Sequence, residues 1–155
     1  MGLVTLAAAP ALASELDRVT PAFQFSERHS TTVRAAPDRV YRAIRDVTAS
    51  EILFFRSLTW LRRLGRPGPE SVLNAPADQT LLEVATRTTF LALVDGPREL
   101  VVGTVVIAPP NTARPSTPAE FVALSTRAGY ALATMNFATH PRADGTCTVS
   151  TETRV

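Results

Sequence analysis

The residue types best suited to acid–base chemistry lie in two Thr-rich stretches near opposite ends of the chain. Glu27 and His29 are two positions apart in the first stretch, and Glu152 and Arg154 are two positions apart in the last. If both stretches are β-strands, each pair lies on one face of its strand, because strand side chains alternate between faces. Carboxylates and imidazoles act as general acids and bases when burial shifts their pKa values. We therefore take Glu27, His29 and Glu152 as candidate catalytic residues.

Many other catalytic chemistries are disfavoured by what the sequence lacks. All 16 basic residues are Arg, so the chain has no Lys for a P-loop or a Schiff base. The patterns G-x-G-x-x-G and G-x-S-x-G do not occur. The two His are far apart, and Cys147 is the single Cys, which favours a small core residue over a metal ligand or nucleophile. We therefore expect no metal and no cofactor.

Length and composition indicate one globular domain. The chain has 155 residues, 45% of them hydrophobic, and no apolar run reaches the roughly 18 residues that span a bilayer. A net charge of +2 is too small to indicate nucleic-acid binding. We therefore expect neither stable membrane insertion nor a nucleic-acid partner. Residues 1–19 form a separate N-terminal segment that lacks the basic start of a signal peptide, which favours a cytoplasmic location over secretion.

Apolar periodicity and turn residues predict an α+β domain over residues 20–155. Alternation predicts a first strand, and Pro37 and a capping box at 48–51 then start two helices. Strands that follow each other through turns favour an antiparallel sheet over a doubly wound parallel one. Gly103 is expected at a bend or bulge. The expected ranges are strands 23–34, 88–94, 98–107, 130–139 and 146–155, helices 37–47, 49–64 and 79–87, and loops 65–78 and 108–119.

Three stretches carry a family resemblance. They are FSERHSTTVRAAPDRVYRAIRDV (25–47), with an Ala-Pro pair before a helix of V-x-x-A-I type, PRELVVGTVV (97–106) and MNFATHPRADGTCTVSTETRV (135–155). Together with the element order, they resemble the START-like or SRPBCC superfamily, which has the helix-grip fold, and its uncharacterised bacterial members in particular. The resemblance spans about residues 20–155, and its motifs concern packing more than activity.

The resemblance implies a curved antiparallel sheet around a long C-terminal helix, with an apolar cavity for lipids, sterols, polyketides or similar molecules. It also implies that the first and last strands are antiparallel neighbours. If their faces coincide, four polar residues would form one group at the cavity wall: Glu27, His29, Glu152 and Arg154. The alternative is a ladder of ion pairs on the solvent face, where each pair contributes only about 0.2–1 kcal/mol. The expected ligand-binding residues are Phe54, Phe55, Leu58, Val101, Val105, Met135, Asn136, Phe137 and Arg154.

The last predicted strand ends at Val155, so the closing helix of the family is expected to be missing. A homodimer, another partner or residues 1–14 would then cover the open face of the sheet. The first expectation for function is binding of a hydrophobic small molecule, without catalysis. The alternatives are a cyclase- or dehydratase-type enzyme that uses Glu27, His29 or Glu152, and an interaction domain that pairs through its sheet.

Overall fold

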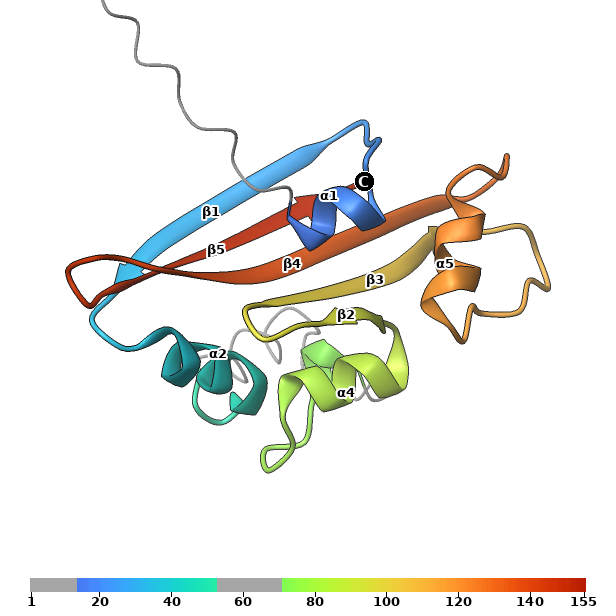
Figure 1. Ribbon diagram of the computed structural model, residues 1–155. Helices are drawn as coiled ribbons and strands as arrows, with labels where there is room; N and C mark the ends of the chain where they lie inside the picture. Colours follow the sequence, from blue (N-terminus) through green and yellow to red (C-terminus); the bar gives the residue numbers. More distant parts are fainter. Residues whose placement is uncertain (1–13, 53–70) are drawn as a thin grey trace, which may run out of the picture.

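Five β-strands form one antiparallel sheet in the order β1-β5-β4-β3-β2 (Figure 1). The computed structural model describes residues 14–52 and 71–155. The strands are β1 (Ser26–Val33), β2 (Leu91–Asp95), β3 (Glu99–Ile107), β4 (Ala131–Pro141) and β5 (Cys147–Arg154). The described helices are α1 (Glu15–Val19), α2 (Pro37–Asp46), α4 (Leu81–Thr88) and α5 (Pro118–Leu124), with a 3-10 turn η1 at Val72–Asn74.

The predicted α+β class and antiparallel sheet are confirmed. β1 pairs with β5 in unbroken register from Ser26–Arg154 to Val33–Cys147, so the first and last strands are antiparallel neighbours. β2 and β3 form the predicted hairpin. Helices α2 and α4 lie where the apolar spacing predicts them. Cys147 is fully buried, as expected for a small core residue.

Two short helices, α1 and α5, were not predicted. α1 lies in the N-terminal segment 1–19, and α5 begins in the predicted loop 108–119 and continues into residues to which no element was assigned. Each has a side-chain cap at its start: the Ser14 hydroxyl accepts the Asp17 N–H, and the Thr117 hydroxyl accepts the Glu120 N–H. Pro118 follows the cap of α5, where its missing N–H costs nothing. A Ser or Thr three residues before an acidic residue is therefore the sequence signal for both helices.

The predicted helix over 49–64 lies mostly outside the described residues. At its start, a Glu51 carboxylate oxygen accepts a hydrogen bond from the Thr48 N–H at 2.7 Å, as the capping box predicts. The described residues 49–52 nevertheless form a turn and a bend, and Thr48 makes an isolated bridge to Thr80. The described part of the predicted loop 65–78 contains η1.

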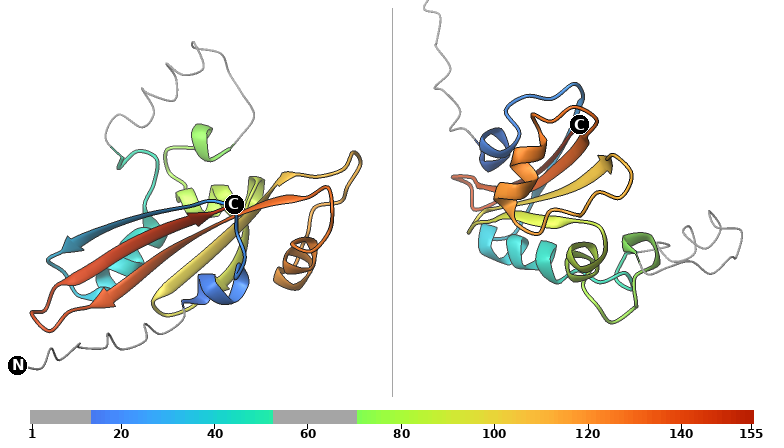
Figure 2. Two further views of the ribbon diagram at one scale, coloured as in Figure 1. Left: turned by 90° about the horizontal axis from the view of Figure 1, so that it is seen from above. Right: turned by 90° about the vertical axis from the view of Figure 1, so that its right-hand side faces the viewer.

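Helices cover both faces of the sheet, so the described chain has three layers (Figure 2). On one face, Leu16 of α1 and Phe121 of α5 pack against Val101. On the other, Tyr41 of α2 packs against Val102. We call these sides the α1 face and the α2 face. Since neighbours in β3 point to opposite sides, its central residues are covered on both.

Gly103 is the point where β3 passes closest to α5. A Cβ atom there would lie 2.6 Å from Phe121 Cζ and 2.7 Å from Leu93 Cδ1. Of the bend or bulge predicted at Gly103, the bulge is wrong, because the register shifts fall at 92–94 in β2 and at 105–107 in β3. Gly103 is instead required so that the Phe121 ring can lie directly on the strand.

Gly103→Ala is expected to lower the free energy of unfolding by about 1–3 kcal/mol, because the added methyl group overpacks the contact with Phe121. Urea denaturation measures this loss. Phe121→Leu in the same chain should relieve the part of the overpacking that involves the ring, while the contact with Leu93 remains, so the two substitutions should be non-additive. Additive losses would show that the Phe121 ring does not lie against Gly103.

Candidate functional site

An apolar cavity of about 330 Å³ lies on the α2 face, between α2, α4, β3 and β4. All twelve of the described residues that line it are apolar. Cavities of about 300–1,000 Å³ with mostly apolar walls are typical of small-molecule sites. Because this lining offers no polar side chain, the cavity suits a ligand whose buried part is hydrocarbon or aromatic.

The helical walls of the cavity follow from apolar residues at helical spacing. Ile44 of α2 and Val47, which directly follows that helix, are three positions apart and share one side. In α4, Leu81, Leu82 and Ala85 present the facing wall. Pro37 and the Thr80 cap fix where the two helices begin, and so determine which residues reach the cavity.

The strand wall follows from the two-residue period of the sheet. Leu100 and Val102 of β3 line the cavity beside Met135 and Phe137 of β4. Met135 and Phe137, which are predicted to bind a ligand, therefore lie in the wall of this cavity, and their contact with a ligand stays a prediction. Three further residues predicted to line the cavity, from the helix expected over 49–64, lie outside the described residues: Phe54, Phe55 and Leu58.

The prediction that Val101 and Val105 line the cavity is wrong. Val101 aligns with Asn136 in the β3–β4 register and points to the α1 face, where it is fully buried against Leu16 and Phe121. Val105 packs against the same cluster and lines a separate pocket of about 210 Å³. β3 is apolar at most positions, so its sequence alone does not show which residues face which layer.

The predicted acid–base group is not assembled, because its members lie on opposite faces of the sheet. Glu27 and His29 align with odd-numbered residues of β5 and point to the α2 face, whereas Glu152 and Arg154 are even-numbered and point to the α1 face. His29 Nε2 lies 3.1 Å from Glu27 Oε1, and the two side chains are 72% and 59% exposed. None of these four residues lines the cavity.

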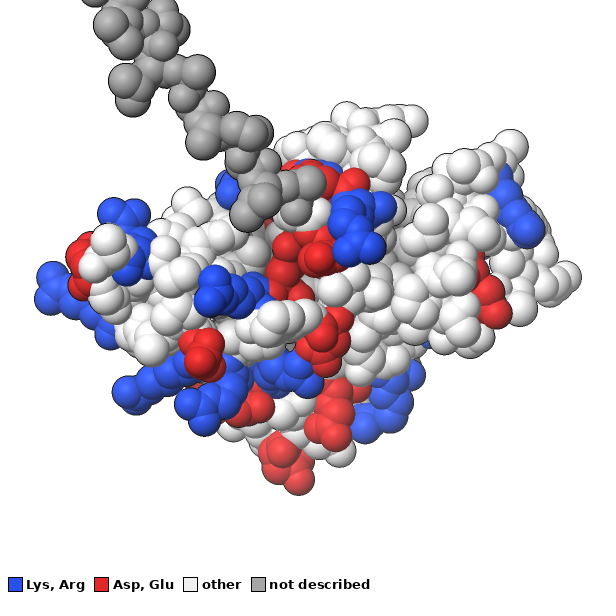
Figure 3. Space-filling view, in the orientation of Figure 1, with Lys and Arg blue, Asp and Glu red and all other residues white. Residues whose placement is uncertain are grey.

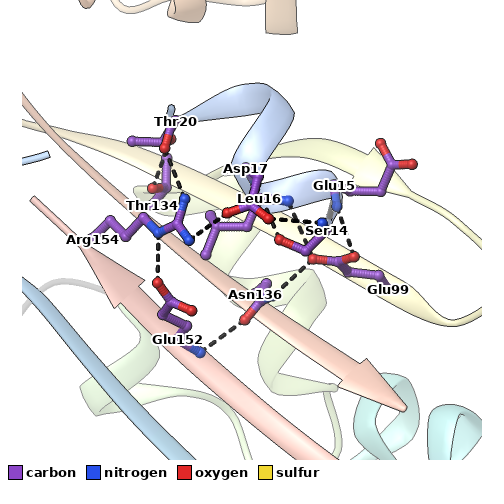
Figure 4. Close-up of polar contacts among 10 residues, drawn as sticks. All are labelled: Ser14, Glu15, Leu16, Asp17, Thr20, Glu99, Thr134, Asn136, Glu152 and Arg154. Carbon is purple, nitrogen blue, oxygen red and sulfur yellow. Dashed lines mark hydrogen bonds and ion pairs between the residues drawn. The ribbon is translucent and has the colours of Figure 1, made fainter. Parts of the chain in front are cut away.

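Arg154 holds the C-terminal end of α1 against the sheet (Figure 4). It is 6% exposed, and its Nε donates to Glu152 at 2.6 Å. Its two other nitrogens donate to the Asp17 carboxylate at 2.6 Å and to the Thr20 carbonyl oxygen at 2.9 Å. One buried guanidinium therefore joins β5 to α1 and to the residue that ends it.

Glu99 holds the N-terminal end of the same helix (Figure 4). Its carboxylate accepts the N–H groups of Glu15 at 2.9 Å and Leu16 at 3.2 Å, and the Asn136 amide at 2.7 Å. The Asn136 amide oxygen accepts the Glu152 N–H at 2.8 Å. A carboxylate at the start of a helix and a cation at its end both interact favourably with the helix dipole and so stabilise the helix.

We call Glu99, Asn136, Glu152 and Arg154 the α1 clamp. The prediction that Asn136 and Arg154 face a ligand cavity is wrong, because both point to the α1 face, where Asn136 binds Glu99 and Glu152 and Arg154 binds α1. Acidic side chains gather beside α1 (Figure 3). Hydrogen bonds from Arg154, and then from Ser14, keep the pKa of Asp17 below its ordinary value.

Tyr41 is an ionisable residue that packs behind the cavity wall. It is 7% exposed and contacts Leu100 and Val102, which both line the cavity. Its hydroxyl donates to Asp95 at 3.3 Å, and Arg45 pairs with the same carboxylate. Burial, and after it the charge of Asp95, raises the pKa of Tyr41 above its ordinary value. Tyr41 therefore stays uncharged at neutral pH and adds no charge to this wall.

Comparisons of the chain with protein-family models, curated proteins and solved structures found no match. None of the described helices has the length and apolar character needed to cross a membrane. Within residues 14–52 and 71–155, no three His, Cys, Asp or Glu side chains are grouped so that they could hold a metal ion. Among the described residues, the apolar cavity of about 330 Å³ is larger than a second pocket of about 210 Å³, which is lined by polar and apolar residues of α4, β2, β3, α5 and the loop before α5.

Arg154→Met is expected to lower the free energy of unfolding by about 2–3 kcal/mol, because it leaves Glu152 and Asp17 without their cation. This is less than for a fully buried pair, since Asp17 is 45% exposed. Arg142→Met is the matched control, because Arg142 is half exposed and lies 3.7 Å from Asp144 in a turn. Equal losses in the two variants, measured in urea, would contradict the role of the clamp.

The stabilisation that Asp17 provides is expected to depend on pH. The pKa of Asp17 is lower in the folded state than in the unfolded state. The stabilisation is therefore complete above about pH 5 and is lost as the pH falls through the pKa of the folded state. Asp17→Asn should therefore reduce stability at pH 7, and the difference from the unchanged protein should shrink below about pH 4. A difference that stays constant from pH 7 to pH 2 would show that the Asp17 charge does not hold α1.

Proposed function

We propose that this domain binds a hydrophobic small molecule in the apolar cavity on the α2 face. The observation that carries the proposal is that every described residue lining a cavity of about 330 Å³ is apolar. Removing apolar ligand surface from water contributes about 25 cal/mol per Å². A polar ligand group buried there would lose its hydrogen bonds to water without replacement. The ligand is therefore a lipid-like chain or a polyketide-like ring system whose polar end stays in solvent.

The proposed family is the START-like or SRPBCC superfamily. Two features support it: the first and last strands are adjacent in the order β1-β5-β4-β3-β2, and a helix follows β1 directly after an Ala-Pro pair. That family binds hydrophobic molecules in a cavity against its sheet. The proposed ligand class therefore agrees with the resemblance of residues 20–155.

Binding without catalysis is favoured over a cyclase- or dehydratase-type reaction. A general acid or base has to come within about 2.6–3.2 Å of the proton that it transfers, or act through one water. The candidate residues Glu27 and His29 are exposed, Glu152 is held in the α1 clamp, and none of them lines the cavity.

Ala85→Trp is expected to weaken binding of the uncharged fluorescent probe N-phenyl-1-naphthylamine at least about tenfold, because the indole and the probe compete for one cavity. A fluorescence titration measures the affinity, and circular dichroism checks that the variant is folded. Ala123→Trp is the control, since it adds the same side chain at an exposed position of α5, on the other side of the sheet. Binding that survives in Ala85→Trp, or is lost equally in both variants, would overturn the proposal.

A further inference from the structure

The outer edge of β1 is a regular strand edge that no described segment covers. β1 is the end strand of the sheet, and β5 is its partner on the inner side (Figure 1). Seven of its eight residues are exposed, and the last, Val33, is half-buried. Such an edge presents a row of backbone N–H and C=O groups to a further strand.

The two edges of the sheet differ in how they are protected. β2, at the far edge, has five residues and a register shift at 92–94, and both features discourage pairing. β1 keeps unbroken register with β5 over all eight residues and contains neither Pro nor Lys. β1 carries the charged side chains of Glu27 and Arg28, but it has no Pro and no bulge to block a further strand, which leaves its edge able to pair.

The hydrogen bonds at the start of β1 show which of its backbone groups point outward. Phe25 and Val155 exchange both N–H···O bonds, at 3.1 and 3.0 Å, so they form a hydrogen-bonded pair. Such pairs alternate along an antiparallel ladder, so the odd-numbered residues of β1 bond to β5. The even-numbered residues therefore point their N–H and C=O groups outward: Ser26, Arg28, Ser30 and Thr32. These four positions are symmetric about His29.

We propose that β1 pairs antiparallel with β1 of a second copy of this chain, about a two-fold axis at His29. In this register Ser26 pairs with Thr32 of the second copy, and Arg28 pairs with Ser30 of the second copy. All the outward backbone groups of the four even-numbered residues then gain partners. Pairing about Arg28 or Ser30 would leave one of the four unpaired, and pairing about Arg28 would also oppose two Arg side chains.

The side chains of β1 match those of a second copy in the same register. Phe25, which is 57% exposed, comes opposite Val33 of the second copy, and aromatic–β-branched pairs stabilise antiparallel strands. Glu27 comes opposite Thr31, so no two Arg or two Glu side chains face each other. A second copy is therefore favoured over an unrelated peptide. The proposal is independent of the cavity, because no residue of β1 lines it.

A cysteine substitution at the axis tests the register. His29 and His29 of the second copy form a non-hydrogen-bonded pair, with Cα atoms about 4.5 Å apart, which lies within the range that a disulfide spans. His29→Cys should therefore give a disulfide-linked dimer on oxidation of the dilute protein. Thr31→Cys is the control, because its symmetry mate lies about four residues, or about 13 Å, away along the strand. The native Cys147 is fully buried in both variants.

A matched pair of variants at Ser30 tests reversible association, measured by sedimentation equilibrium. Ser30→Glu places a carboxylate opposite Arg28 of the second copy and should tighten the dimer about threefold or more, whereas Ser30→Lys should weaken it to a similar extent. Ser30 is exposed, so both variants should fold. A strictly monomeric protein, or crosslinking by His29→Cys and Thr31→Cys to the same extent, would overturn the proposal. Binding of an extended peptide to this edge, without binding of a second copy, would also overturn the proposal.

Discussion

β4 pairs antiparallel with β3 on one side and with β5 on the other, and this double register decides which side chains reach which face of the sheet. Asn136 aligns with Val101 and Glu152, so these residues point to α1. Met135 aligns with Val102, so both point to α2 and α4. A slip of β4 by one residue would turn Asn136 toward α2 and α4, and would turn Met135 and Phe137 toward α1. The cavity and the clamp therefore depend on the same pairing.

α1 is held on the sheet by polar side chains of the strands. A helix of five residues is too short to be stable alone, so it depends on its docking contacts. Leu16 supplies a fully buried apolar contact, and Glu99 and Arg154 bind the two ends of the helix. With α1 and α5 closing this side, the apolar cavity is formed on the other side, where α2 and α4 meet the sheet (Figure 2).

Much of the fold was predictable, because local signals determine it. Alternation in β1 and β5, Pro37 at the start of α2 and turn residues between strands each act over a few positions. The site was harder to predict, because it depends on pairing between distant segments. Leu100, Val101 and Val102 are all apolar, and only their contacts with helices distinguish cavity lining from closed core. In the same way, spacing alone did not show that Glu152 lies on the face opposite Glu27.

The most direct test of the cavity is the methyl signal of Met135 in an NMR titration. The chain has two Met residues, Met1 and Met135, so selective ¹³C-methyl labelling gives a readout from the cavity wall. Adding N-phenyl-1-naphthylamine should shift the Met135 signal in a saturable way, with intermolecular NOEs from the probe to Met135. Saturable binding with an unchanged Met135 signal, and without NOEs from the probe to Met135, would contradict this assignment.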